Sequence, residues 1–330
     1  MSAIAPTVQG FFTQRLINQK QASPNTISAY KDTLRLLLVF ASQRGGRSPC
    51  DLDFADLGVT TISAFLDHLE VERGNTARTR NTRLAAIRSL FRYAALQHPE
   101  HAELIGRVLA MPTKRTDRTD IAFLNPDETN ALLAAPDRAR WVGRRDHALL
   151  LTAVQTGLRV SELTAASWAD VHLGRGPHIR CTGKGRKQRS TPLTAETVEA
   201  LRVWGQETGI EAPSPLFPTS RGRHLSVDAV ELLVANHSAT ARRHCPSLTE
   251  KAVTPHVLRH TCAMNLLRAG VEVAVIALWL GHENVETTAR IYLHADMTIK
   301  ERALARTTPT GTSPGRYRPP DRLLAFLEAL

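Results

Sequence analysis

Side chains of the kinds that react with phosphate esters occur in four short clusters between residues 156 and 292. Two guanidinium groups can bind the non-bridging oxygens of one phosphate and offset charge that develops at phosphorus. A lysine and a histidine can move protons, and a tyrosine becomes a competent nucleophile in an electropositive site. The clusters supply these groups in the chain order Arg159, Lys184, His256, Arg259, His282 and Tyr292. The set fits phosphoryl transfer through a covalent tyrosine intermediate.

The first cluster is TGLRVSEL, residues 156–163. Its glycine predicts the end of one helix, so Arg159 stands near the start of the next. Glu162 follows three residues later, shares the same helix face and can hold the guanidinium of Arg159 in place. Taken alone, the cluster also fits an ordinary helix ion pair.

The second cluster, GKGRK at 183–187, separates two predicted strands at 178–182 and 188–193. Two glycines at such a turn suit a hairpin. Lys184 lies at the tip, where it could reach into a nucleic-acid groove or protonate a leaving oxygen, and we expect Arg186 and Lys187 to contact DNA. The glycine–lysine spacing of a P-loop is absent, which argues against a nucleotide site.

The last two clusters contain the histidines. In HVLRHT, His256 and Arg259 lie one helical turn apart and can converge on a single ligand. The pair His256 and His260 has a spacing that zinc could use, but Val257 replaces the glutamate of the metalloprotease motif, so we expect no metal. His282 follows a glycine that ends an apolar helix predicted over 271–280, so its ring can point into a cleft, although a capping or core role is the alternative.

The elements that must position these groups are mostly helical. Over residues 7–110, Ser23 and Pro24 predict a helix start and the glycine pair at 45–46 its end, and a further helix is predicted over about 60–72. We therefore expect a mainly α protein with a helical N-terminal domain. A mostly helical catalytic domain that carries a small antiparallel β-sheet should follow it.

An arginine-rich face is predicted on the helix over 76–93. Arg78, Arg88 and Arg92 lie opposite the apolar face, and no acidic residue occurs between positions 74 and 98 to pair with them. This favours contact with DNA phosphates. A solvated charged face is the alternative.

Overall charge limits the class of partner. The 330 residues contain 42 Lys and Arg against 31 Asp and Glu, a net charge of +11, which favours a polyanion. Neither an apolar run long enough to cross a bilayer nor a signal-peptide pattern is present, so a cytoplasmic location without a membrane partner is expected. Four cysteines far apart, without a C-x-x-C pair, suggest neither a disulfide framework nor a zinc site.

The domain organisation follows from composition. We expect a DNA-binding domain at 7–110, a polar linker at 111–122, a catalytic domain at 123–306 and a flexible tail at 307–330. The tail ends in a predicted helix with apolar residues between Leu323 and Leu330. A short helix is marginal in water unless its apolar face is covered, so it must pack on its own domain or on a neighbouring subunit.

The four motifs TGLRVSEL, GKGRK, HVLRHT and LGHENVETTARIYLH together resemble the signature of the tyrosine recombinases, the phage integrase family. Each motif is weak alone, but four in order on a basic two-domain chain are specific. The resemblance implies site-specific cleavage and rejoining of double-stranded DNA at recombination sites, in the service of a mobile element. It also implies a homo-tetramer on two duplexes and a C-terminal helix that packs on the adjacent subunit.

The same resemblance implies a role for each residue. Arg159 and Arg259 would bind the scissile phosphate, and Glu162 would orient Arg159. Lys184 would protonate the 5′-hydroxyl leaving group, His256 would act in acid–base chemistry and His282 would hydrogen-bond the phosphate. Tyr292 would form a 3′-phosphotyrosyl bond that conserves the bond energy, so neither ATP nor a metal cofactor is implied.

One spacing departs from the family pattern, because ten positions separate His282 from Tyr292, one more than expected. An added residue turns a helix by about 100°, so a loop must absorb it or Tyr292 must move into place. Tyr30, Tyr93 and Tyr317 lie in the first domain or the tail and are poorer candidates for the nucleophile.

A type IB topoisomerase-like relaxase and a catalytically silent DNA-binding protein are the alternative functions. A metal-dependent nuclease would need a carboxylate cluster that the sequence does not show.

Overall fold

The computed structural model describes residues 4–116, 121–183, 188–209, 213–282 and 288. The chain divides into two compact units, Met1–Thr119 and Asp120–Leu330. Each unit has its own hydrophobic core.

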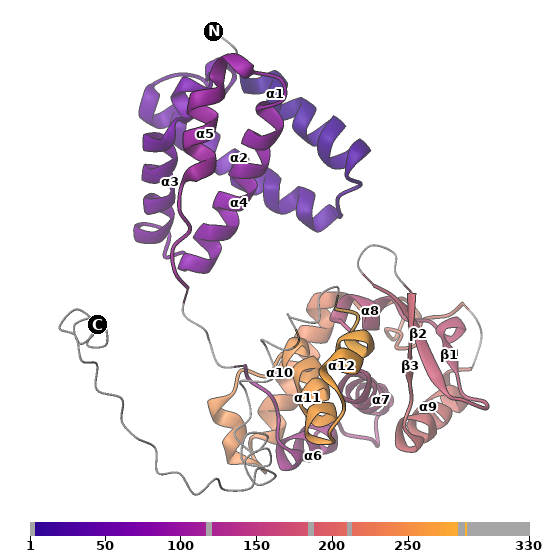
Figure 1. The fold of residues 1–330 in the computed structure, drawn as a ribbon. Helices are drawn as coiled ribbons and strands as arrows, with labels where there is room; N and C mark the ends of the chain where they lie inside the picture. Colours follow the sequence, from indigo (N-terminus) through magenta and orange to yellow (C-terminus); the bar gives the residue numbers. More distant parts are fainter. Residues whose placement is uncertain (1–3, 117–120, 184–187, 210–212, 283–287, 289–330) are drawn as a thin grey trace, which may run out of the picture. The chain divides into compact units, whose positions relative to one another are not determined.

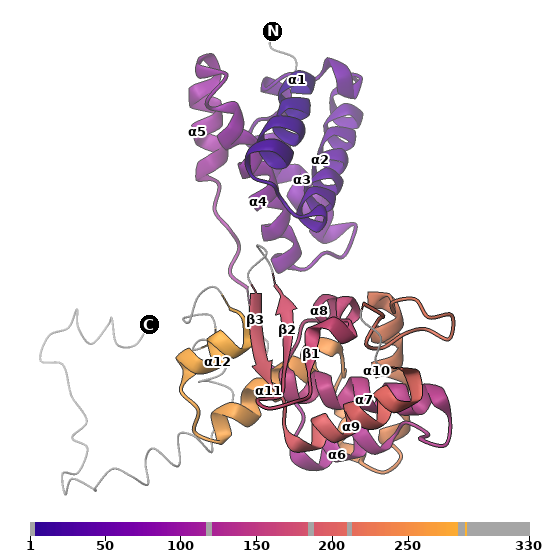
Figure 2. The same cartoon turned by 90° about the vertical axis from the view of Figure 1, so that its right-hand side faces the viewer.

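The first unit is built from helices and short helical turns (Figures 1 and 2). They are α1 (Ile4–Gly10), the π-helix η1 (Phe11–Gln19), α2 (Pro24–Gly45), the 3-10 turns η2 (Pro49–Asp51) and η3 (Ala55–Leu57), α3 (Val59–Val71), α4 (Ala77–Ala94), the 3-10 turn η4 (Pro99–His101) and α5 (Ala102–Ala110). Ser23 accepts a hydrogen bond from the backbone N–H of Thr26 at the start of α2, and Gly46 ends this helix with a φ of 65°. Both predicted boundaries of α2 are confirmed.

Helix α4 separates apolar and basic side chains as its sequence predicts. Leu84, Ile87 and Phe91 are buried in the core of the unit. On the other side, Arg78 and Arg92 are exposed, whereas Arg88 is half-buried. The exposed part of the predicted arginine face is therefore open to a ligand.

Residues at the start of the expected 111–122 linker are held by the first unit. The Met111 side chain is part of its core. The backbone N–H of Lys114 donates to the Asn81 side chain, and the Lys114 ammonium lies 2.6 Å from a carboxylate oxygen of Glu70. Residues 111–114 thus extend the first unit beyond α5.

The second unit contains a three-stranded sheet and seven α-helices among the described residues. Its elements are α6 (Pro126–Ala134), α7 (Trp141–Thr156), α8 (Val160–Ala165), the 3-10 turn η5 (Trp168–Asp170), β1 (Val171–His172), β2 (His178–Thr182), β3 (Gln188–Pro192), α9 (Ala195–Thr208), α10 (Val227–Ala241), the 3-10 turn η7 (Pro246–Glu250), α11 (Pro255–Arg268) and α12 (Val273–Leu280). The strand order is β1-β2-β3 and both pairs are antiparallel, with Cys181 opposite Arg189. The expected hairpin strands are confirmed to within one residue.

Helix α7 forms the centre of the second unit and packs against α6, α9 and α11. Its consecutive residues Ala148, Leu149 and Leu150 are all buried, as expected for a helix covered on several sides. Helix α12 lies beside α11 and β3 (Figure 2). The C-terminal ends of α7 and α12 thereby come close to the start of α8.

These features confirm the expected class of fold, which is mainly helical with one small antiparallel sheet in the second unit. In the described part of the chain, no helix combines the length and the apolarity that a bilayer crossing would need.

A close contact at Gly157 gives a test of this packing. Gly157 has a φ of +64°, and a Cβ atom there would lie 2.7 Å from Leu280 Cδ2 and 3.1 Å from Cys262 Sγ. Gly176 has a similar φ of +72° with nothing within 4 Å of an added Cβ. We expect Gly157→Ala to lower the free energy of unfolding by at least about 1 kcal/mol more than Gly176→Ala, because only the first adds a methyl group to a filled space. Urea denaturation of both variants measures the difference, and equal losses would contradict the packing.

Candidate active site

The carboxylate of Glu162 forms the centre of the candidate site. It accepts a hydrogen bond from the backbone N–H of Arg159 at 2.8 Å and one from the Arg159 guanidinium at 2.9 Å. The first of these contacts also caps the start of α8. The predicted contact between Glu162 and Arg159 is therefore present, and the Glu162 side chain is only 3% exposed.

A second arginine that the sequence analysis did not select also binds Glu162. Arg189 of β3 donates to both carboxylate oxygens at 2.8 and 2.7 Å, and its Nε donates to the carbonyl of Trp279. A signal for this role was available: the alternation of a strand puts Arg189 on the same face as the buried Thr191. An arginine on a core-facing position needs buried hydrogen-bond acceptors, and a carboxylate is one such partner.

The second predicted phosphate-binding arginine lies on α11. Arg259 is 3% exposed and donates at 2.6 Å to the carbonyl of Gly157 and at 2.6 Å to that of Leu280. Arg159 donates at 2.9 Å to the neighbouring carbonyl of Gly281. The carbonyls at a helix C-terminus carry partial negative charge, so the ends of α7 and α12 hold both guanidinium groups in one place.

Three histidines surround these arginines. His256 and His260 of α11 lie edge to face with ring centroids 4.3 Å apart. The ring of His282, which follows Gly281 at the end of α12, lies with its Nδ1 2.7 Å from the hydroxyl of Thr288. Thr288 is fully buried.

Burial and nearby positive charge lower the pKa of each of these histidines. Desolvation lowers the pKa of His282 to about 4, and the charges of Arg259 and Arg159 add to the effect. Desolvation, then His256 and Arg259, lowers the pKa of His260 to about 4. The pKa of His256 is lowered by desolvation and then by Arg259 and Arg159. At neutral pH the imidazoles are therefore uncharged, and in the described part of the site the positive charge resides on arginines.

Burial acts on the pKa of Glu162 in the opposite direction, but its partners reverse that effect. Burial alone would raise it, but hydrogen bonds from Arg189 and from the Arg159 backbone, together with both positive charges, lower it overall. Glu162 is therefore an anion that holds cations and is unsuited to proton transfer at neutral pH.

The structure thus brings Arg159, Arg259, His256 and His282 together with Glu162 in the second unit. The remaining predicted residues of this site, Lys184, Arg186, Lys187 and Tyr292, lie outside the described residues.

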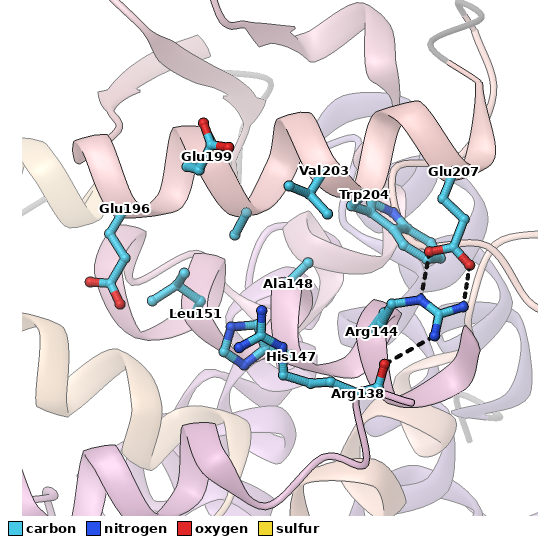
Figure 3. A pocket seen from close by; sticks show the side chains of 11 residues that line it. Arg138, Arg144, His147, Ala148, Leu151, Glu196, Glu199, Val203, Trp204 and Glu207 are labelled. Carbon is cyan, nitrogen blue, oxygen red and sulfur yellow. Dashed lines mark hydrogen bonds and ion pairs between the residues drawn. The ribbon is translucent and has the colours of Figure 1, made fainter. Parts of the chain in front are cut away.

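A separate hollow lies elsewhere on the second unit. It is a pocket with a volume of about 360 Å³. Figure 3 shows its lining side chains between α7 and α9, which include Leu151, Val203 and Trp204, with Arg144 paired to Glu207 at one side. None of the predicted site residues lines it. Among the described residues, no group of three or more His, Cys, Asp or Glu side chains is placed to hold a metal ion.

Comparison with known proteins assigns the family. Residues 122–298 match the model of the phage integrase family, and residues 10–98 match that of the phage integrase N-terminal SAM-like domain. The first match alone spans more than half of the chain. The chain belongs to the phage integrase family.

Individual relatives agree with this assignment. The chain is 53% identical to the integrase/recombinase y4rC of Sinorhizobium fredii over 329 residues, which cover 100% of this chain and 99% of that relative. It is 32% identical to the tyrosine recombinase XerC of Xanthomonas campestris over 296 residues, covering 90% of this chain and 85% of XerC. In fold it is similar to the Tn1549 transposon integrase in complex with transposon right end DNA, with a TM-score of 0.70, 16% identity and coverage of 92% and 99%.

The predicted family and enzyme class, DNA breaking and rejoining by a tyrosine recombinase, are therefore confirmed.

The histidine pKa values predict how the stability of this integrase family member depends on pH. Because the pKa of a buried histidine is lower in the folded state, the unfolded state binds protons first as the pH falls. The free energy of unfolding should therefore decrease as the pH falls from about 6.5 towards 4. His260→Gln should make this decrease shallower, as measured by urea denaturation at several pH values. The same dependence in wild type and variant would show that His260 does not contribute.

Proposed function

We propose that this chain is a site-specific DNA recombinase that cleaves and rejoins strands through a 3′-phosphotyrosyl intermediate formed by Tyr292. The observation that carries the proposal is the convergence of Arg159 and Arg259, both anchored by carbonyls at adjacent helix ends, beside His256 and His282. This arrangement offers a phosphate two fixed cations and neutral imidazoles.

The two arginines bind the scissile phosphate in this mechanism. The Arg159 side chain is 34% exposed, so a ligand can approach it from solvent. Because Arg159 and Arg259 are already held before DNA binds, they need little reorganisation to offset the charge that develops on the pentacoordinate phosphorus. Arg259 is almost fully buried, which strengthens its interaction with an anion.

Neutral histidines complete the phosphate contacts. When the Thr288 hydroxyl donates to Nδ1 of His282, the ring carries its proton on Nε2 and can donate it to a phosphate oxygen. A lowered pKa keeps His256 unprotonated, so it can accept the phenol proton as Tyr292 attacks.

Tyr292 and Lys184 complete the reaction. Attack by the phenolic oxygen on phosphorus forms the tyrosyl ester and releases the 5′-oxygen, which Lys184 protonates. Thr288, four positions before Tyr292, already contacts His282. Positions four apart share a face of a helix, so a helical path from Thr288 would bring Tyr292 to the same site despite the added residue in this segment.

The proposed partner is double-stranded DNA with recombination sites. A net charge of +11 and the exposed Arg78 and Arg92 of α4 favour phosphate contacts. The likeness in fold to a transposon integrase in complex with transposon DNA supports the same partner here. We propose that the active form is a homo-tetramer on two duplexes, with the apolar tail segment packed on a neighbouring subunit.

Replacement of the nucleophile tests the chemistry. Tyr292→Phe should bind DNA but form no covalent adduct, because it lacks the phenolic oxygen. Tyr317→Phe is the matched control and should form the adduct as wild type does. The measurement is a denaturing gel of protein mixed with nicked duplexes, built from any inverted repeats that sequencing of the DNA beside the gene identifies. A covalent band with Tyr292→Phe would assign the nucleophile elsewhere.

Removal of the tail tests the assembly. A chain without residues 307–330 should form tetramers on DNA less well, while its affinity for a single binding site should stay within about threefold, because only the intersubunit contact is lost. Sedimentation analysis and gel shifts measure the two quantities. Undiminished tetramer formation would refute a bridging role for the tail.

A further inference from the structure

We propose that Arg189 is a positioning residue for DNA cleavage: it neutralises Glu162 so that the charge of Arg159 remains available to the scissile phosphate. The proposal rests on the function proposed above and concerns a residue of β3 that need not touch DNA itself.

Two arginines share the carboxylate of Glu162. Arg189 takes both oxygens of Glu162 in a forked pair at 2.8 and 2.7 Å, whereas the Arg159 guanidinium makes one contact at 2.9 Å. Arg159 uses a different nitrogen for the carbonyl of Gly281. The stronger, two-bond contact is thus made by the more buried arginine, since Arg189 is 12% exposed and Arg159 34%.

Charge balance explains why this division matters. A pair of Arg159 and Glu162 alone has no net charge, and a neutral pair attracts a phosphate weakly. With Arg189 the three groups carry one net positive charge, and Arg259 adds another nearby. Loss of Arg189 would leave the buried Glu162 paired with Arg159, the other arginine that contacts its carboxylate. Arg159 would then turn towards the carboxylate and away from the phosphate.

Arg189 also fixes the backbone that carries His282. Its Nε donates to the carbonyl of Trp279 at 3.0 Å. A Cβ atom on Gly281 would lie 2.9 Å from its guanidinium, so the turn before His282 packs directly on this side chain. The Arg189 guanidinium thus lies between Glu162 and the turn before His282, and the role proposed for it is its charge on Glu162.

The experiment compares variants that separate charge from shape. Arg189→Gln removes the charge and the fork. Glu162→Gln with Arg189→Gln removes the anion as well, so nothing draws Arg159 away. Arg189→Lys keeps the charge without the fork. Arg180→Gln on the adjacent strand β2 is the control. This variant loses the same charge, but the Arg180 side chain donates its hydrogen bond to the carbonyl of Ala169 and not to Glu162.

The readout is the single-turnover rate of covalent adduct formation on nicked duplexes. Two duplexes are compared, with an ordinary phosphodiester or an uncharged methylphosphonate at the scissile position. On the phosphodiester, Arg189→Gln should be about 10- to 100-fold slower than wild type, in the range seen when one transition-state donor is lost. The double variant should react at least about fivefold faster than Arg189→Gln. The rate of Arg189→Lys should lie between those of wild type and Arg189→Gln, and Arg180→Gln should react at the wild-type rate.

The methylphosphonate distinguishes positioning from general support of the fold. It removes the charge that Arg159 offsets, so Arg189→Gln should slow its cleavage by less than about threefold. Equal slowing on both duplexes, or no recovery in the double variant, would overturn the proposal. If wild type forms no adduct, the proposed function itself fails, whereas normal cleavage by Arg189→Gln would refute only the role of Arg189. Circular dichroism and thermal melting check that each variant folds. If Arg189→Gln does not fold, the rates of Arg189→Lys and of the double variant on the two duplexes test the role of Arg189.

Discussion

A buried anion organises the basic groups of the second unit. Glu162 is almost inaccessible to water, and a carboxylate in that environment stays charged only when cations lie within hydrogen-bonding distance. Arg159 at the start of α8 and Arg189 on β3 meet this requirement from two elements that are separate in sequence. Removing one partner from a buried pair typically costs about 3–5 kcal/mol. The fold and the electrostatics of the site are therefore determined by the same contact.

The helix ends supply the second set of anchors. Helices α7 and α12 both end at glycines with left-handed backbone, Gly157 and Gly281. Their last carbonyls point towards arginines that belong to α8 and α11. The entropy of holding these long side chains is lost when the protein folds, so the phosphate contact proposed above would not cost it again. Desolvation beside these cations keeps the imidazoles neutral, so charged and uncharged nitrogen groups lie close together in the second unit.

Much of this arrangement could be predicted from the sequence because it depends on local spacing. The break at Gly157, the contact between Arg159 and Glu162, the two strands of the hairpin and the end of α12 before His282 all depend on residues a few positions apart. Turn and capping rules apply at that range. The predicted grouping of Arg159 with Arg259 instead came from the chemistry that two guanidinium groups can perform on one phosphate, and the likeness to a family added their individual roles.

The interactions that were missed join distant segments. Arg189 and Glu162 are 27 positions apart, and nothing in a single sequence pairs that arginine with that carboxylate. The same limit applies to residues 111–114, which composition places in a linker but which tertiary contacts hold against the first unit. Polarity describes such a segment, whereas its place in the fold depends on partners elsewhere in the chain, here Asn81 and Glu70.

The use of backbone carbonyls as ligands for Arg159 and Arg259 has an evolutionary consequence. Every amino acid carries the same carbonyl group, so point substitutions at Leu280 leave the hydrogen-bond acceptor in place, provided that the helix still ends there. An insertion or deletion upstream of Gly281 would shift these acceptors, whereas a change of length downstream of His282 would leave them in place. The anchoring of the arginines can therefore tolerate sequence divergence and a change of length in the segment that carries the tyrosine.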